Sequence, residues 1–425
     1  MPLTFTSFSF GCRVNEAERQ ILDQKLKGAG FVPSKGSPDL FVINTCAVTQ
    51  KAEREARQLV YQLRRKHPNS KIILTGCAAT YWLQNDLWNT LPVDLMVHNK
   101  NKENLAERIQ RLFHKTKGKS HKTRLQNKFT SSGRLLIKIQ DGCNRFCTYC
   151  IVPSLRGLPR SYPIQSILNT LNRCDKNIKE VILTTINTEA YGQETNETLP
   201  QLVESILKKT HIPRISFGSI NPWSITSEFL DVYRKYGSTG RLVNFFHIPV
   251  QSGSNTILSL MKRGYTVEEF QKKLELLSTL DPFTFIATDV IVGFLGETEK
   301  EFEETYRFLK NSPISKFHIF RFSLRKNTQA CRLSRNILEP TTQVKANRAK
   351  RLAALGKKKY EAFLKKHIGH TFSALFLERR NGQYQSVLFS NQIPAHIKTE
   401  KNRRGIIGKV RILEFKKGAL FGTID

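Results

Sequence analysis

The stretch DGCNRFCTYC (Asp141–Cys150) places Cys143, Cys147 and Cys150 in one short loop directly after a predicted strand. Three thiolates spaced C-x3-C-x2-C can converge on one face of a cubane iron–sulfur cluster and leave its fourth iron open. A structural zinc site needs a fourth Cys or His, and none lies close by in the sequence. The motif therefore predicts a cluster, with zinc or free thiols as the alternatives, at the strand ends where α/β folds build active sites.

The residues around this loop alternate between strand-like and amphipathic segments. The six strand-like runs are Leu135–Ile139, Glu180–Ile186, Arg214–Ile220, Val243–Val250, Phe285–Phe294 and Phe317–Ser323. This succession predicts a central α/β domain over residues 135–366 with a partial (β/α)6 barrel. The number of units alone also fits a doubly wound sheet.

Residues 1–112 show the same alternation on a smaller scale, with a helical pattern over Gln50–Lys66 and a strand-like run over Val93–Val97 among its segments. They predict a second α/β domain with a small parallel sheet. Single cysteines follow three of its predicted strands: Cys12 in FGCRVN, Cys46 in INTCAVT and Cys77 in LTGCAA. Taken singly, a cysteine is more often a small buried apolar residue. Three at equivalent strand ends meet at one edge of a parallel sheet, so we expect a second site there.

Two basic segments complete the chain. The stretch from Arg111 to Arg134 carries eight Lys and Arg and no acidic residue, which predicts a basic linker over residues 113–134. A helix is expected from Val344 to Lys366. Residues 367–425 then show short strand-like runs, Thr371–Leu377, Tyr384–Phe389 and Ile406–Phe415, with Gly and Asn turns between them. This is typical of a small antiparallel β-barrel.

Composition narrows the class of protein. The 425 residues carry 68 Lys and Arg against 35 Asp and Glu, and this excess indicates a polyanionic partner such as nucleic acid. From Thr341 onward there are 19 basic and five acidic residues, so we expect this part to contact RNA or DNA. No apolar run approaches the ~20 residues of a membrane span. Eight cysteines are too sparse for a secreted disulfide scaffold, which predicts a cytoplasmic protein without membrane contact.

The two cysteine sets together resemble the methylthiotransferases of the radical S-adenosylmethionine (SAM) class. Further matching phrases are YCIVPSLRG (149–157), HIPVQSGSNTIL (247–258), MKRGYT (261–266) and DVIVGFLGETEKEF (289–302). The resemblance covers almost the whole chain, and its last residues are similar to a TRAM-type RNA-binding barrel. It implies two 4Fe-4S clusters, one on Cys143, Cys147 and Cys150 with SAM on its open iron, and one on Cys12, Cys46 and Cys77.

Within that family, GCRVN and NTCAVT are most similar to the branch that adds a methylthio group to carbon two of N6-threonylcarbamoyladenosine, next to the anticodon of tRNA. The alternatives are branches that act on isopentenyladenosine in tRNA or on a ribosomal protein aspartate. The resemblance implies three partners: the tRNA anticodon stem-loop, an electron donor such as flavodoxin or ferredoxin, and a sulfur source.

The resemblance also implies contacts to SAM, from Asn187, Gln251, Ile291 and Gly293. Each has an ordinary structural alternative, as a turn residue, a polar strand end or an apolar strand. Arg156 is expected to be a solvated arginine rather than a ligand contact, and no role is expected for Cys174 or Cys331.

The chain departs from the family pattern at five positions around the expected SAM pocket: Thr185, Glu189, Asn221, Leu295 and Asn327. These changes put the SAM contacts in question, whereas all six cluster cysteines are present. An inactive iron–sulfur RNA-binding relative is therefore a further alternative.

Overall fold

The computed structural model describes residues 2–113 and 133–425, so nearly all of the predicted basic linker lies outside the described residues. Within the described ranges, no helix is long and apolar enough to cross a membrane. The chain forms two compact units. The first holds the described residues up to 113 together with residues 141–144 and 150–159. The second holds residues 133–140, 145–149 and 160–425.

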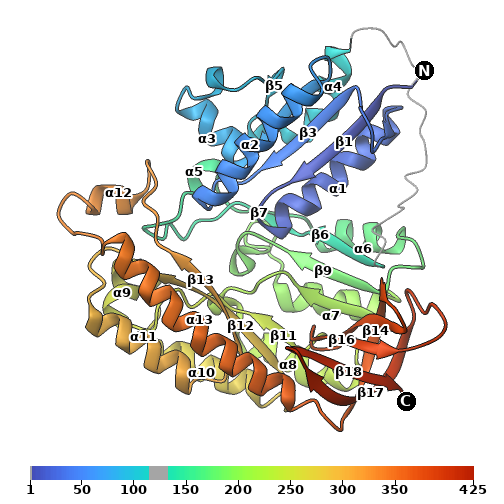
Figure 1. Ribbon diagram of the computed structural model, residues 1–425, viewed down its shortest axis with the longest axis vertical. Helices are drawn as coiled ribbons and strands as arrows, with labels where there is room; N and C mark the ends of the chain where they lie inside the picture. Colours follow the sequence, from blue (N-terminus) through green and yellow to red (C-terminus); the bar gives the residue numbers. More distant parts are fainter. Residues whose placement is uncertain (1, 114–132) are drawn as a thin grey trace. The chain divides into compact units, whose positions relative to one another are not determined.

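The first unit is built on a parallel sheet with the strand order β2-β1-β3-β4-β5 (Figure 1). Its strands are β1 (Thr4–Ser9), β2 (Val32–Pro33), β3 (Leu40–Thr45), β4 (Lys71–Gly76) and β5 (Leu95–Met96). Every residue of β3 is buried, as expected for a parallel strand covered on both faces. Helices α1 (Arg13–Gly28) and α4 (Leu105–Leu112) pack on one face, and α2 (Gln50–Lys66) and α3 (Cys77–Gln84) pack on the other. The predicted parallel sheet is confirmed.

The second unit contains six parallel strands that neighbour one another in chain order. They are β6 (Arg134–Lys138), β9 (Glu180–Thr184), β10 (Arg214–Phe217), β11 (Phe245–His247), β12 (Phe285–Val292) and β13 (Lys316–Arg321). The first three pair in parallel, as do the last three, and a parallel bridge between Ile215 and Leu242 joins the two sets. A doubly wound sheet reverses its strand order at a switch point. The unbroken order therefore identifies the partial barrel.

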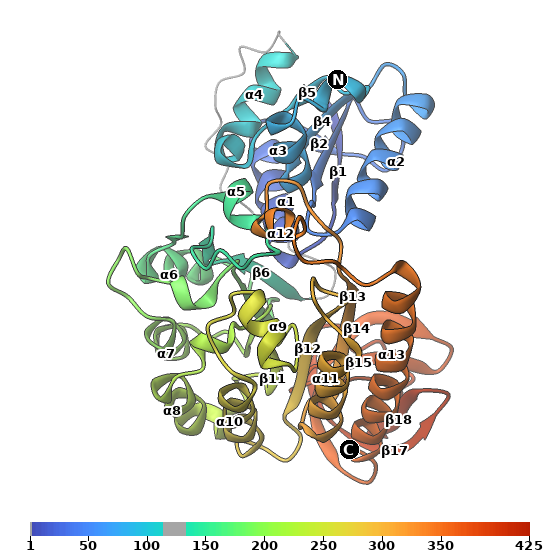
Figure 2. The same cartoon turned by 90° about the vertical axis from the view of Figure 1, so that its left-hand side faces the viewer.

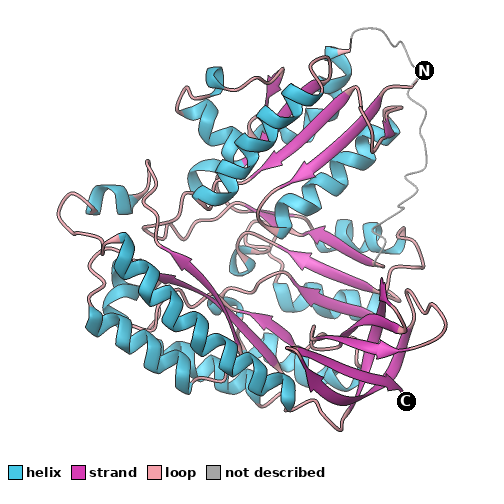
Figure 3. Ribbon diagram, in the orientation of Figure 1, coloured by secondary structure: helices cyan, strands magenta, loops and turns pink. Residues whose placement is uncertain are grey.

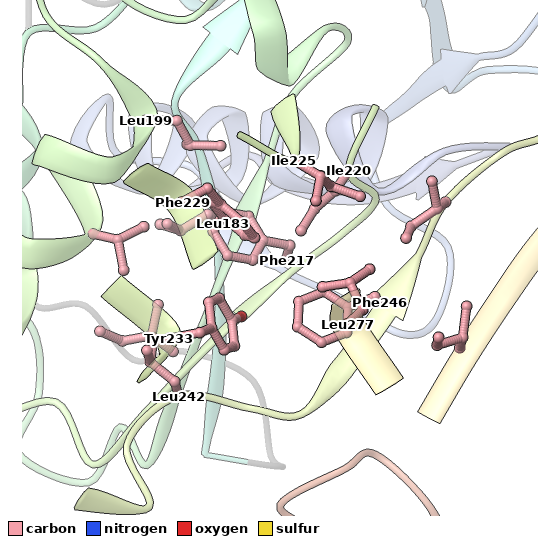
Figure 4. Close-up of a cluster of buried hydrophobic side chains, with 14 of the residues drawn as sticks. Leu183, Leu199, Phe217, Ile220, Ile225, Phe229, Tyr233, Leu242, Phe246 and Leu277 are labelled. Carbon is pink, nitrogen blue, oxygen red and sulfur yellow. The ribbon is translucent and has the colours of Figure 1, made fainter. Parts of the chain in front are cut away.

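Helices cover the outside of this curved sheet (Figure 2). They are α6 (Ile164–Asn172), α7 (Leu199–Lys209), α8 (Ser227–Tyr236), α10 (Val267–Ser278), α11 (Glu299–Asn311) and α13 (Thr342–Lys365). The short helices α9 (Asn255–Leu260) and α12 (Gln329–Leu333) instead pack in a separate apolar cluster with Phe294 and Phe322. Thr198, Thr266 and Thr298 begin α7, α10 and α11 with capping boxes, in which a Gln or Glu three residues later bonds back. Between strands and helices lies an apolar core that includes Leu183, Phe217, Phe229 and Phe246 (Figure 4).

The C-terminal residues form a closed five-stranded barrel in the order β14-β15-β16-β18-β17 (Figure 3). Its strands are β14 (Thr371–Asn381), β15 (Tyr384–Phe389), β16 (Pro394–Lys398), β17 (Ile407–Lys416) and β18 (Ala419–Ile424). The predicted barrel is confirmed, but β16 and β18 pair in parallel while the other pairs are antiparallel. Arg214 at the start of β10 donates to Leu388 O at 2.9 Å, which ties this barrel to the amino end of a strand of the partial barrel.

Candidate cluster sites

Cys12, Cys46 and Cys77 lie at one edge of the first unit's sheet. Cys12 lies between β1 and α1, Cys46 follows β3 directly, and Cys77 begins α3 directly after β4. Because β1, β3 and β4 are parallel neighbours, their carboxyl ends meet at the same edge. Cys46 and Cys77 are buried, and Cys12 is exposed. The structure thus brings the three predicted residues to one place.

Two glycines allow the loops at this edge to approach closely. Gly11 has φ +85°, and a Cβ there would lie 2.4 Å from both Cβ and Sγ of Cys46. Gly76 has φ +99°, and a Cβ there would lie 2.3 Å from Thr45 O. A side chain at either position would therefore displace backbone or the Cys46 side chain. The repeated Gly-Cys pairs at residues 11–12 and 76–77 are the sequence signal of this close packing.

The three thiols interact electrostatically. Burial first, and then the charges of Cys77 and Cys12, raise the pKa of Cys46 to about 12. Such a thiol stays protonated at neutral pH unless a metal replaces the proton. Hydrogen-bond donors already face two of the sulfurs: Val48 N lies 3.4 Å from Cys46 Sγ, and Asn99 Nδ2 lies 3.6 Å from Cys77 Sγ.

Arg156 reaches the same edge from α5 (Val152–Arg156). Its Nε donates to Cys77 Sγ at 3.3 Å, and its terminal nitrogens bond the carboxylates of Glu18 and Asp141 at 2.9 and 2.8 Å. Although burial alone would lower it, the charges of Cys77, Glu18 and Asp141 hold the pKa of Arg156 well above its ordinary value. The expectation of a solvated arginine is wrong, because this side chain is 5% exposed and fully engaged.

The Cys143–Cys150 loop is fixed by bonds within each compact unit. In the first unit, Cys143 N donates to Gly157 O at 3.1 Å. In the second, Thr148 N donates to Met261 O at 3.1 Å. Arg263 Nη1 donates to Cys147 Sγ at 3.3 Å and to the Tyr149 hydroxyl at 3.2 Å. We did not expect a role for Arg263, although it lies in the matched phrase MKRGYT.

Both cysteine sets suit an iron–sulfur cluster by their chemistry. Each offers three thiols, the soft donors that such clusters take. The buried cations Arg156 and Lys102 interact with the charge of Cys77 in the N-terminal set, and both also pair with Glu18. Among residues 2–113 and 133–425, no group of three His, Cys, Asp or Glu is arranged to hold a single metal ion.

The expected SAM contacts lie at or beyond the carboxyl ends of the barrel strands. Asn187 is fully buried; its Oδ1 accepts from Glu189 N at 3.2 Å, while its Nδ2 has no partner among the described residues. Gln251 has φ +72°, and its Oε1 likewise lacks a partner in the described part of the chain. Gly293 N donates to the Glu297 carboxylate at 2.5 Å, and Ile291 is half-buried. The turn-residue alternative thus accounts for one end of the Asn187 amide and leaves the other end open.

The positions that depart from the family pattern are accommodated by local contacts. Glu189 forms an ion pair with Arg145, whose guanidinium lies 4.0 Å from the centre of the Trp223 ring. Asn221 Oδ1 accepts from Thr188 N at 3.0 Å. Asn327 has φ +66°, a conformation that Asn adopts more readily than most residues other than Gly.

Two further departures from the family pattern, Leu295 and Thr185, and the thiol of Cys174 need no ligand to explain their surroundings. Leu295 is fully buried in an apolar cluster, and Thr185 is half-buried. Cys174 Sγ donates to Thr170 O at 3.2 Å within its own helical turn.

A further polar pair lies on the barrel strands. His247 Nε2 is 2.8 Å from Asp289 Oδ1, and the ring of His247 lies 5.2 Å from that of His318. Both members of the pair belong to matched phrases, HIPVQSGSNTIL and DVIVGFLGETEKEF, for which we expected no role at these residues.

Comparison with known proteins places these features in a family. Residues 137–309 match the model of the radical SAM superfamily, and residues 4–98 match that of uncharacterized protein family UPF0004. The threonylcarbamoyladenosine tRNA methylthiotransferase MtaB of Aquifex aeolicus (strain VF5) is 34% identical over 383 residues, which are 87% of this chain and 92% of the relative.

Two other comparisons bear on branch and fold. The tRNA-2-methylthio-N(6)-dimethylallyladenosine synthase of Thermodesulfovibrio yellowstonii (strain ATCC 51303 / DSM 11347 / YP87) is 34% identical over 355 residues, 80% of each chain. The solved structure of OxsB, a cobalamin-dependent SAM radical enzyme, has a TM-score of 0.51 at 14% identity and covers 85% of this chain and 56% of its own. This last likeness supports the fold.

Proposed function

Because the chain belongs to the radical SAM methylthiotransferase family, we propose that it adds a methylthio group to carbon two of N6-threonylcarbamoyladenosine next to the anticodon of tRNA. The observation that carries the proposal is the meeting of Cys12, Cys46 and Cys77 at one sheet edge, in addition to the three-cysteine loop of the radical SAM domain. One relative from each of the two tRNA branches is 34% identical to this chain, so overall identity to these two does not separate the branches. The phrases GCRVN and NTCAVT support the threonylcarbamoyl branch.

We propose that each cysteine set holds one 4Fe-4S cluster. Cys143, Cys147 and Cys150 would hold the cluster that binds SAM, which would supply, with one electron from the electron donor, a radical able to take hydrogen from carbon two of the adenine. Cys12, Cys46 and Cys77 would hold the cluster that would supply the methylthio sulfur. The open amide of Asn187 and the open carbonyl of Gln251 are available to polar groups of SAM. Arg263 orients Cys147 through its hydrogen bond to the sulfur.

The outer surface of the C-terminal barrel supports RNA binding. Lys398, Thr423 and Arg411 are cross-strand neighbours on β16, β18 and β17, and Lys409 lies two residues from Arg411. The side chains of Lys398, Lys409 and Arg411 are exposed. The residues that alternate with them along the strands, Ile397, Val410 and Ile412, are buried. We call Lys398, Lys409 and Arg411 the outer cationic patch. Cations so placed bind phosphates.

Aromatic rings lie beside this patch. The ring of Phe421 lies 5.3 Å from both Tyr384 and His396, and all three are half-buried. Tyr384 pairs directly with Lys398 across the strands. Half-exposed aromatic rings next to cations suit unstacked bases of an RNA loop, as in an anticodon stem-loop. An electron donor such as flavodoxin or ferredoxin and a sulfur source complete the proposed set of partners, in the cytoplasm.

The substrate is tested by nucleoside mass spectrometry of tRNA from cells that lack the gene, with and without complementation by the wild-type chain. We expect loss of the methylthio group from threonylcarbamoyladenosine and its return on complementation. Loss from the isopentenyl nucleoside instead would assign the neighbouring branch. Unchanged tRNA together with loss of methylthiolation from a ribosomal protein would refute a tRNA substrate.

Cluster number is tested by iron analysis after anaerobic reconstitution. Two cubanes give about eight irons per chain, and replacing Cys12, Cys46 and Cys77 together by Ala should leave about four. Replacing Cys143, Cys147 and Cys150 together should also leave about four and should abolish SAM cleavage. Iron content unchanged by the N-terminal substitutions would remove the second cluster from the proposal.

A further inference from the structure

We propose that Arg156 is a positioning residue of the N-terminal cluster site: it holds the Cys77 sulfur in place and sets how readily the cluster there is reduced. This inference rests on the proposed function, because it assumes a cluster on Cys12, Cys46 and Cys77. Arg156 itself lies outside the N-terminal stretch that supplies those cysteines. It is six residues beyond Cys150, the last cysteine of the other set.

The geometry uses the whole guanidinium group. Arg has five N–H donors in a planar fork, and five hydrogen bonds leave this one. Nε donates to Cys77 Sγ. One terminal nitrogen bonds Glu18 and Asp141, and the other bonds Asn15 Oδ1 at 2.6 Å and the second oxygen of Glu18 at 3.3 Å. A lysine has neither the planar fork nor the reach to replace these bonds.

The partners of Arg156 are themselves anchored. Lys102 Nζ bonds Glu18 Oε2 at 2.5 Å and Asn44 Oδ1 at 3.0 Å, and Asn15 Nδ2 donates to Thr45 O at 3.0 Å. The positive charges of Arg156 and Lys102 thus equal the negative charges of Glu18 and Asp141 inside the first unit. The Arg156 fork is fixed on three sides, so the direction of its Nε–H toward Cys77 is fixed as well.

The segment that carries Arg156 is built to reach this edge. Ile151 and Leu155 are buried in the core formed by β3, β4, α2 and α3. Gly157 follows Arg156 with φ +78°, and its carbonyl accepts Cys143 N. The peptide after the second cysteine set therefore completes the site of the first set.

Donation of an N–H to a ligating sulfur withdraws electron density from it, and a nearby positive charge stabilises the more negative, reduced cluster. Both effects raise the reduction potential. Removing them should make the cluster harder to reduce and should weaken its retention, since changes to such supporting residues typically cost about 10- to 100-fold in metal affinity or activity.

The test uses the full chain with Cys143, Cys147 and Cys150 replaced by Ala, which leaves the N-terminal cluster alone. Two substitutions are made in this parent protein. Arg156→Gln removes the positive charge of the side chain, and Arg156→Lys keeps it. We expect the reduction equilibrium constant to fall about tenfold in Arg156→Gln, equal to about 59 mV for one electron. The expected loss is smaller in Arg156→Lys. Iron release to a chelator should be about tenfold faster or more in both.

Arg64→Lys is the matched control. Arg64 bonds four acceptors in the same unit, at Pro68, Ser70, Pro92 and Asp94, and touches none of the cysteines. We expect Arg64→Lys to lower the free energy of unfolding without changing the potential. Arg156→Lys covers the case in which Arg156→Gln does not fold, because it keeps the charge and should shift the potential in the same direction by a smaller amount.

If the two Arg156 variants lose stability as the control does, while potential and iron release stay at parental values, Arg156 is a structural residue only and the inference is wrong. A failure of the proposed function gives a different result. In that case the parent with Cys143, Cys147 and Cys150 replaced would itself hold no iron.

Discussion

Removing the outer cationic patch should reduce both the affinity for tRNA and its dependence on salt. The change is Lys398→Ala together with Lys409→Ala and Arg411→Ala. These residues are exposed on neighbouring strands and project outward, so the substitutions leave the barrel interior intact. Each phosphate neutralised on a single-stranded loop contributes about −0.7 to the slope of log K against log salt, so three contacts contribute about −2. Between about 50 and about 200 mM salt, this share of the binding weakens about 20-fold.

The assay is a binding titration with an unmodified anticodon stem-loop at several salt concentrations. The control is Lys398→Arg with Lys409→Arg and Arg411→Lys, which exchanges the side chains and keeps all three charges. We expect the alanine variant to have a slope shallower by about 2 and the control to keep the parental slope. SAM cleavage without RNA should be equal in all three proteins. If the alanine variant binds with the parental slope, these cations do not contact phosphate and the barrel surface assigned to RNA is the wrong one.

Two further predictions concern stability. Gly11→Ala should lower the free energy of unfolding by about 2 to 4 kcal/mol in urea titrations, because it combines a positive φ with a Cβ 2.4 Å from Cys46. The control is Gly28→Ala, whose added Cβ would meet nothing within 4 Å and which should not destabilise the protein. Equal losses at both glycines would contradict the argument. Burial raises the pKa of Glu297 from 4.5 to about 7, against the Gly293 N–H and Arg348, which lower it. Because its folded pKa lies above the unfolded one, stability is lost as pH rises from about 4.5 through about 7, by up to about 3 kcal/mol. Glu297→Gln should flatten this profile, and an unchanged slope would show that other groups cause it.

Local patterns predicted the elements of the fold well. Helix α2 has the predicted bounds Gln50–Lys66, because Thr49 caps its first turn and its apolar residues recur at helical spacing. Strand β15 also has its predicted bounds, Tyr384–Phe389. Strand β5 is shorter than the expected Val93–Val97 and spans only Leu95–Met96. It is an edge strand with one neighbour, so fewer backbone bonds define its ends.

Local sequence patterns did not predict which strands pair or which polar side chains bond one another. Alternation of buried and exposed residues is the same in parallel and antiparallel strands, so nothing in the runs distinguished the β16–β18 pair. Arg156 is the clearest case among the site residues. Its partners Glu18 and Asn15 lie 138 and 141 positions away in the chain. The phrase SLRG by itself gives no indication of a carboxylate or a thiol beside the guanidinium.

The composition of the first compact unit bears on the order in which the protein is made. Its sheet is encoded before residue 98, yet the unit also includes residues 141–144 and 150–159. A ribosome that has released only the residues up to 113 has therefore delivered the sheet without Asp141 or Arg156, which leaves Glu18 and Lys102 to pair alone. Domains generally fold as units during synthesis, from the amino terminus onward. The first unit is therefore complete only after residue 159 has been made, so Cys12, Cys46, Cys77, Cys143, Cys147 and Cys150 all emerge before the first unit is complete.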